Sequence, residues 1–180
     1  MHRIVKTGYV DMAHRIRGHE GKCRFLHGHT WKIELSVSCE DDQLNALGMV
    51  VDFGILAEHF FQPIQDFFDH SCILGKDDET AILAGQHETP EGVVQRHSSL
   101  DHLTHDLYAG PGFSAHGAKL NVKFLDFNIT AETLSKHLFE MALVKLHALQ
   151  PYGVKVDYVR VYEQLHPTES YAEYRPDMKC

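Results

Sequence analysis

The sequence predicts an α+β domain with an antiparallel sheet and helices on one face. In residues 30–39, apolar and polar side chains alternate, which is the period of a half-buried strand. In residues 53–68, large apolar side chains recur at helical spacing. The expected element order is strand, strand, helix, an insertion that contains a strand, helix, strand, and this order favours the α+β class.

Local signals give approximate limits to these elements. A first β-like segment covers residues 2–14, and Asp52 is the expected N-cap of the first helix, which Pro63 should kink. A second helix should begin at Thr130 and end before Pro151. Further strands are expected at residues 119–125 and 154–164, followed by an irregular tail from His166 onward.

The apolar periodicity weakens between about residues 75 and 118, where Gly, Asp, Glu and His dominate. The chain has no internal repeat and no low-complexity linker. We therefore expect one domain over residues 1–180, with a loop-rich insertion at about 75–118.

Composition excludes several classes of protein. The net charge of −8 over 180 residues argues against binding to nucleic acid or anionic membranes. No apolar stretch approaches the roughly 18–20 residues of a membrane helix, and the N-terminus lacks an apolar signal core. The four cysteines form no C-x-x-C pair and are expected to be reduced thiols. A cytoplasmic protein is the expectation.

A histidine cluster is the strongest chemical signal. His27 and His29 flank Gly28, and side chains two residues apart on an extended chain point to the same side. If the first two strands pair as a hairpin, His14 falls near them. Three neutral imidazoles with an open fourth position are typical of catalytic zinc. A closed structural site with Cys23 as fourth ligand is the alternative.

Four further residues are candidates for function, each with a structural alternative. Asp69 can orient and polarise His70, or cap the end of the first helix. Glu132 is in the first turn of the second helix, where the helix dipole alone would favour a carboxylate. Glu163 is near the end of an otherwise apolar strand face, where a carboxylate favours a functional role unless the position is at a sheet edge.

Together these residues resemble the 6-pyruvoyltetrahydropterin synthase superfamily, and more closely its bacterial 6-carboxytetrahydropterin synthase branch. The Cys-x₃-His-Gly-His spacing from Cys23 favours that branch. Matching blocks occur in family order at residues 12–15, 21–31, 48–53, 69–70, 128–132 and 161–163. The chain departs from the family pattern in its long insertion and in Ile129, where proline is common.

The resemblance implies a T-fold, an antiparallel four-stranded sheet with two helices on one face. It also implies a homo-oligomer, commonly a hexamer built from two trimers, with active sites between subunits. The implied substrate is 7,8-dihydroneopterin triphosphate, and the implied products are 6-carboxy-5,6,7,8-tetrahydropterin, acetaldehyde and triphosphate, in queuosine precursor synthesis.

The resemblance also implies roles for individual residues. Zn²⁺ would be held by His14, His27 and His29, with Cys23 as the catalytic base. Asp69 and His70 would form a proton relay, and Glu163 would anchor the pterin with help from Glu132. Two alternatives remain: a 6-pyruvoyltetrahydropterin synthase-type reaction, and a non-catalytic oligomer that binds zinc or a pterin.

Overall fold

The computed structural model describes residues 1–75, 78, 113–115, 118–165 and 169–176. The chain divides into two compact units. The first unit comprises residues 1–10, 30–65 and 131–180, and the second comprises residues 11–29 and 66–130. Most of the expected insertion lies outside the described residues, so its loop-rich character and the single-domain organisation stay predictions.

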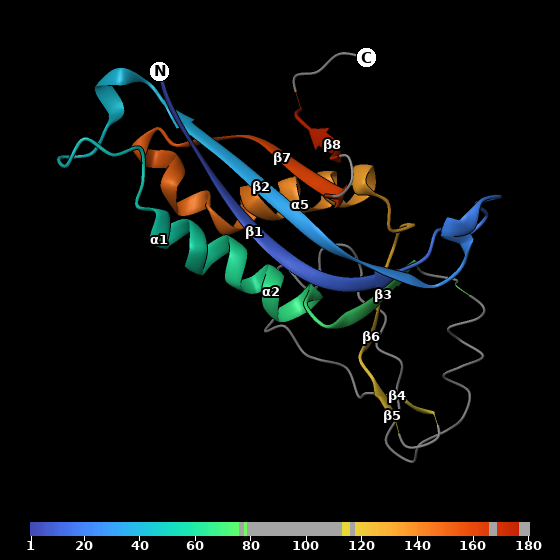
Figure 1. Cartoon of the computed structure of the whole chain (residues 1–180). Helices are drawn as coiled ribbons and strands as arrows, with labels where there is room; N and C mark the ends of the chain where they lie inside the picture. The colour runs from blue at the N-terminus through green and yellow to red at the C-terminus, as the bar shows by residue number, and fades with distance from the viewer. Residues whose placement is uncertain (76–77, 79–112, 116–117, 166–168, 177–180) are drawn as a thin grey trace. The chain divides into compact units, whose positions relative to one another are not determined.

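The main sheet has six strands in the hydrogen-bonded order β6-β3-β1-β2-β7-β8 (Figure 1). By residue range, β1 and β2 each belong partly to both units. β3 pairs in parallel with β1 and β6, whereas β7 pairs antiparallel with β2 and β8. The expected purely antiparallel, four-stranded sheet is therefore wrong, although the α+β class is correct. The strands of the main sheet are β1 (His2–His14), β2 (His27–Cys39), β3 (Ser71–Gly75), β6 (Val122–Leu125), β7 (Lys155–Gln164) and β8 (Ser170–Tyr174). A second, two-stranded sheet pairs β4 (Phe113–Ala115) with β5 (Ala118–Leu120).

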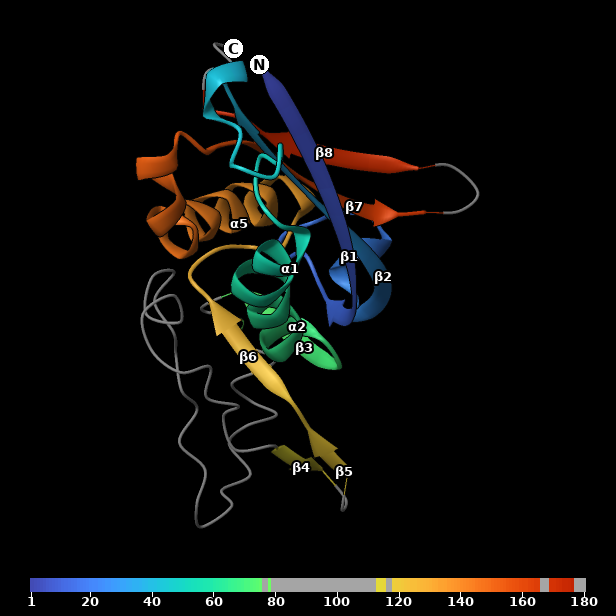
Figure 2. The same cartoon turned by 90° about the vertical axis from the view of Figure 1, so that its left-hand side faces the viewer.

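The two parallel pairings explain why the sheet differs from the expectation. A helical segment connects β2 to β3, and such a crossover lets β3 enter the sheet parallel to β1. β3 is short and nearly uniformly apolar, so it shows no alternation that would mark it as a strand. The tail was also wrongly expected to be irregular, because residues 170–174 form β8 by pairing with β7 (Figure 2).

The first predicted helix is confirmed, with a π-helical turn in its middle. The backbone N–H of Gly54 donates to Oδ1 of Asp52 at 2.6 Å, so Asp52 is the N-cap. Pro63 has no N–H to continue the α-helical ladder, and the turn before it closes through the N–H of Gln62 and the carbonyl of Ala57. The segment consists of α1 (Phe53–Leu56), the π turn η3 (Ala57–Phe61) and α2 (Gln62–Phe68).

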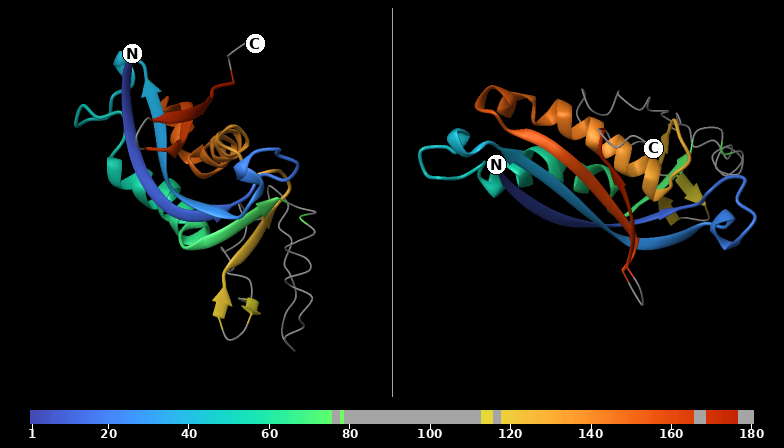
Figure 3. Two further views of the ribbon diagram at one scale, coloured as in Figure 1. Left: turned by 45° about the vertical axis from the view of Figure 1, so that its right-hand side comes forward. Right: turned by 90° about the horizontal axis from the view of Figure 1, so that it is seen from above.

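The second predicted helix is α5 (Ala131–Lys145), which begins one residue after the expected start at Thr130. It ends earlier than predicted, because residues His147–Tyr152, including Pro151, form the 3-10 helix η4. Within the first unit α5 packs against β7, β8 and η3 (Figure 3), which agrees with the expected placement of both helical segments on one face of the sheet. Within the described part of the chain, no helix has the length and apolarity needed to cross a bilayer.

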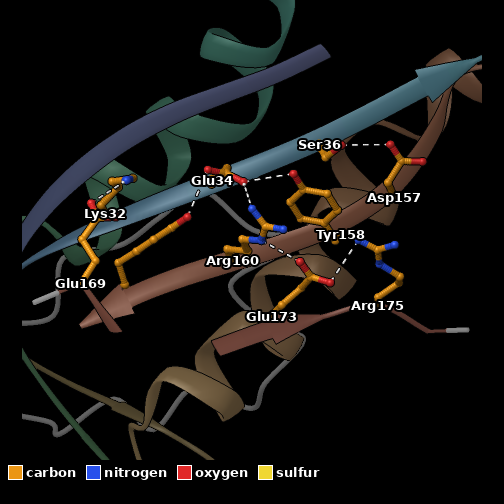
Figure 4. Close-up of polar contacts among 10 residues, drawn as sticks. Lys32, Glu34, Ser36, Asp157, Tyr158, Arg160, Glu169, Glu173 and Arg175 are labelled. Carbon is orange, nitrogen blue, oxygen red and sulfur yellow. Dashed lines mark hydrogen bonds and ion pairs between the residues drawn. The ribbon is translucent and has the colours of Figure 1, made fainter. Parts of the chain in front are cut away.

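A network of polar side chains joins β2, β7 and β8 in the first unit (Figure 4). Glu34 pairs in register with Arg160 and accepts hydrogen bonds from Arg160 at 2.9 Å, Tyr158 at 3.0 Å and Tyr162 at 3.3 Å. Arg160 also donates to Glu173 on β8 at 2.6 Å. These contacts fix the register of the three strands through side chains in addition to the backbone ladder.

Candidate functional site

Three histidines lie where β1 ends and β2 begins, within the second unit. His14 is the last residue of β1, and His27 and His29 are at the start of β2. A Cβ atom built on Gly28 would lie 3.6 Å from the carbonyl oxygen of Met12 and 3.9 Å from Cα of Ala13. The start of β2 therefore passes directly beside the end of β1, as the hairpin hypothesis required.

The three rings form a compact cluster. Their centroids are 4.6 Å apart for His14 and His27, 4.9 Å for His27 and His29, and 5.5 Å for His14 and His29. One ring nitrogen from each lies within 4.8 Å of the others, which is close enough for all three to bind one ion. His14 is fully buried, and the other two are half-buried.

Backbone carbonyls orient two of these rings. Nδ1 of His14 lies 2.8 Å from the carbonyl oxygen of Ile129, and Nδ1 of His27 lies 2.8 Å from that of Phe25. A carbonyl can only accept, so each Nδ1 donates, and in the neutral form of each ring this tautomer leaves the lone pair on Nε2. A histidine that donates its second ring nitrogen to a carbonyl is typical of a metal ligand, and neutral imidazoles suit zinc. The donor set therefore fits Zn²⁺.

Cys23 is a half-buried free thiol in the 3-10 turn Lys22–Arg24. Its backbone carbonyl accepts a hydrogen bond from the N–H of Ile16 at 2.8 Å, which ties the turn to the chain that leaves β1. Among the described residues, its sulfur is not part of the group of donor atoms around the three histidines. The described structure therefore does not form the closed Cys-His₃ site that was the alternative.

Asp69 and His70 form a hydrogen-bonded pair after α2, also in the second unit. Oδ1 of Asp69 accepts from the backbone N–H of Asp11 at 2.8 Å, and Oδ2 lies 2.8 Å from Nδ1 of His70. The hydrogen bond from Asp11 is the largest cause that lowers the pKa of Asp69, and the hydrogen bond from His70 lowers it further. Asp69 is therefore an ionised acceptor, Nδ1 of His70 donates to it, and the His70 side chain is exposed.

The backbone of this pair is also constrained. The N–H of His70 donates to the carbonyl of Asp11 at 2.7 Å, and His70 has a φ of +53°. Asp69 thus bonds to the end of β1 and to His70. The hydrogen bond to His70 is compatible with the orienting role of Asp69, which stays a prediction.

The two remaining predicted residues belong to the first unit. Glu132 is exposed in the first turn of α5. Glu163 is half-buried near the end of β7.

The sequence did not reveal two hydrogen-bond acceptors in the second unit, namely the carboxylate of Asp78 and the backbone carbonyl of Ile129. Arg15, which directly follows His14, donates from Nε and Nη2 to the buried carboxylate of Asp78. Asp78 lies in a run of charged residues that does not distinguish it. The carbonyl of Ile129 has no sequence signature, because every residue carries one.

The protein therefore has an α+β fold in which three imidazoles cluster at the ends of two neighbouring strands, and this cluster places it among proteins that can hold a transition-metal ion. The sequence profile of the 6-pyruvoyl tetrahydropterin synthase family matches residues 3–177, and the chain belongs to this family. The predicted family is therefore confirmed.

Curated relatives match part of the chain. The 6-carboxy-5,6,7,8-tetrahydropterin synthase of Rickettsia felis is 44% identical over 69 residues, which are 38% of this chain and 49% of the relative. The synthase of the same name from Haemophilus influenzae is 39% identical over 80 residues, 44% of this chain and 57% of the relative. The chain thus spans about half the length of the curated relatives it matches.

Solved structures share the fold across nearly the whole chain. An uncharacterized protein from Wolinella succinogenes has a TM-score of 0.70 at 20% identity, covering 98% of both chains. A Plasmodium vivax 6-pyruvoyltetrahydropterin synthase has a TM-score of 0.57 at 15% identity, covering 97% of this chain and 98% of its own. At these identities the likeness supports the fold alone.

Proposed function

We propose that this protein is a zinc-dependent lyase that converts 7,8-dihydroneopterin triphosphate and water into 6-carboxy-5,6,7,8-tetrahydropterin, acetaldehyde and triphosphate, for queuosine precursor synthesis. The observation that carries the proposal is the cluster of three histidines. In two of them Nδ1 is hydrogen-bonded to a backbone carbonyl, so Nε2 is the atom that is available to bind a metal ion. The names of the partial relatives and the Cys-x₃-His-Gly-His spacing favour this branch of the family.

In this proposal His14, His27 and His29 hold Zn²⁺ through their neutral rings. Bound zinc would act as a Lewis acid that makes neighbouring C–H and O–H groups of the substrate more acidic. The three neutral ligands leave the charge of the ion uncompensated, which favours an oxygen ligand from the substrate at an open position.

Two groups move protons. Cys23 acts as the base that removes a proton from carbon, a role assigned on the resemblance to the family. His70 passes protons through Nε2, while the Asp69 carboxylate keeps the proton on Nδ1. Release of triphosphate needs no protein nucleophile.

Recognition of the pterin is assigned to Glu163, with Glu132 assisting. A carboxylate matches the guanidine-like edge of a pterin, because its two oxygens accept two parallel N–H hydrogen bonds. Arg15 is bound to Asp78, so Lys22 and Arg24 are the better candidates for contacting the triphosphate.

The experiment loads the protein with zinc, supplies 7,8-dihydroneopterin triphosphate and assays 6-carboxytetrahydropterin and acetaldehyde. Native protein should form both, Cys23→Ala should form neither, and Cys39→Ala, which alters a buried thiol in the first unit, should keep the activity. Formation of 6-pyruvoyltetrahydropterin would replace the proposal with the sister reaction. Zinc binding without turnover would favour the non-catalytic binding role.

Assembly and location follow from the same resemblance. We expect a homo-oligomer, a hexamer of two trimers, in the cytoplasm. Light scattering coupled to size exclusion tests the assembly, and a monomer that turns over substrate would contradict the expectation that neighbouring subunits complete the site.

A further inference from the structure

A buried lysine holds the end of α2 in the second unit. Lys123 on β6 is 3% exposed, and its Nζ donates a hydrogen bond to the carbonyl of Phe67 in the last turn of the helix. Nζ also lies 4.6 Å from the centroid of the Phe67 ring. Burial lowers the pKa of Lys123 to about 8, against the opposing attraction of Asp66. Burying a cation is costly unless it is paired and hydrogen-bonded, so this lysine is held by specific partners.

A second set of hydrogen bonds supports the same helix end. The hydroxyl of Ser71 lies 3.1 Å from the Phe67 carbonyl oxygen and accepts from the side-chain amide of Asn121 at 2.8 Å. The carbonyl of Asn121 in turn accepts from the N–H of Cys72 at 2.8 Å. Asn121 directly precedes β6, so the residues that hold the end of α2 and the start of β3 come from one short segment.

Asp69 and His70 form the turn between the end of α2 and the start of β3. On one side their backbone and carboxylate are bonded to Asp11 at the end of β1. On the other side the chain enters the turn at Phe67 and leaves it at Ser71, both bonded to the segment around β6. The positive φ of His70 is disfavoured for a residue with a Cβ atom, so the turn keeps this shape only while its surroundings hold it.

We propose that the Asn121–Lys123 segment positions the Asp69–His70 pair for proton transfer, by fixing the helix end from which the turn leaves. Lys123 and Asn121 bond to the helix end and to Ser71, so they are positioning residues rather than catalytic ones. In the sequence, β6 follows the expected insertion at about 75–118. This inference rests on the proposed function, because it takes Asp69 and His70 as the acid–base pair.

The test compares Lys123→Met and Asn121→Ala with Met141→Ala, which removes a buried side chain from α5 in the first unit. In the zinc-loaded enzyme, the first two variants should lower kcat about tenfold to a hundredfold with KM within about twofold, as expected for a misplaced proton carrier. Met141→Ala should lower the stability but leave kcat unchanged. Equal kcat losses in all three variants would overturn the proposal.

A double-mutant cycle separates positioning from a general structural role. If Lys123 acts through the relay, Lys123→Met should cause no further loss of kcat in a His70→Gln background. Losses that multiply in the double variant would show that Lys123 acts by another route and would overturn the proposal.

Amide hydrogen exchange keeps the inference testable even if the proposed activity is absent. Lys123→Met should speed the exchange of the His70 N–H, which donates to Asp11, while amides of β7 stay unchanged. If native protein makes no product but the variant shows this local change, the function fails and the structural support of the turn stands. Unchanged exchange at His70 would overturn the inference whatever the activity.

Discussion

Arg15 donates two hydrogen bonds to the carboxylate of Asp78, whose side chain is 2% exposed. The guanidinium is itself mostly buried, at 22% exposure, and follows the proposed metal ligand His14 in sequence. A bidentate pair of this kind combines charge with fixed geometry. It joins the residue after β1 to the chain that follows β3.

Breaking this pair should be costly. Asp78→Ala leaves the Arg15 guanidinium without its buried partner, so we expect a loss of about 3 kcal/mol in the free energy of unfolding, measured in urea. The matched control is the double variant Arg15→Met/Asp78→Leu, which removes both charges and should recover much of the loss. A single-variant loss below about 1 kcal/mol, as for surface pairs, would contradict the burial of this contact.

Replacing His27 or His14 should weaken zinc binding in both cases, but only the replacement of His14 should also lower the stability of the zinc-free protein. His27→Ala should weaken zinc binding by more than the roughly 10–100-fold typical of losing an outer partner. The zinc-free fold should change little, because the ring is half-buried and its hydrogen bond goes to the carbonyl of nearby Phe25. His14→Ala should also reduce the stability of the zinc-free protein, because its ring is fully buried and bonds to Ile129. Competition with a chromophoric chelator measures the zinc affinity. Exposed His59→Ala is the control, and zinc affinity that is unchanged in His27→Ala would refute the metal assignment.

Asp69 should contribute to stability in a way that is lost in acid. Its pKa is below the ordinary value of 3.8, first because of the Asp11 N–H, so the native state favours the ionised form. The contribution is present above pH 3.8 and is lost as the pH falls through the folded-state pKa. The difference in unfolding free energy between native protein and Asp69→Asn should therefore shrink below pH 3.8, as denaturation at several pH values will measure. A constant difference would show that the carboxylate is not held as described.

Lys123 predicts a pH-dependent stability in alkali, and the slope has the same sign as that of Asp69. The pKa of Lys123 is about 8 in the folded protein against the ordinary lysine value of 10.5, so between these values the unfolded chain binds more protons. Native protein should therefore gain stability relative to Lys123→Met as the pH rises from 8 to 10.5, by at most about 1.4 kcal/mol per pH unit. Burial raises the pKa of Cys72 to about 11, but this group is common to both proteins and cancels in the difference. Parallel stability curves would mean that the ammonium is not buried.

Features set by neighbours in the chain were predictable from the sequence. The alternation in residues 30–39, the Asp52 cap and the apolar spacing of residues 53–68 each depend on local backbone geometry, and each element is present. The approach of His27 and His29 follows from the two-residue period of a strand, and only the hairpin hypothesis was needed to add His14.

Features that depend on distant partners were decided by the tertiary structure. β3 and β8 became strands because β1, β6 and β7 supply their hydrogen bonds, not because their own residues alternate. The carbonyl of Ile129 fixes the His14 tautomer, although a carbonyl is common to every residue and marks none. Nothing in the sequence marks Asp78 or Lys123 as buried, since burial and pairing are properties of the folded environment and not of residue type. The sequence alone thus determined the local elements and the chemistry of the histidine motif, whereas long-range packing decided which strands pair and which polar groups hold the site.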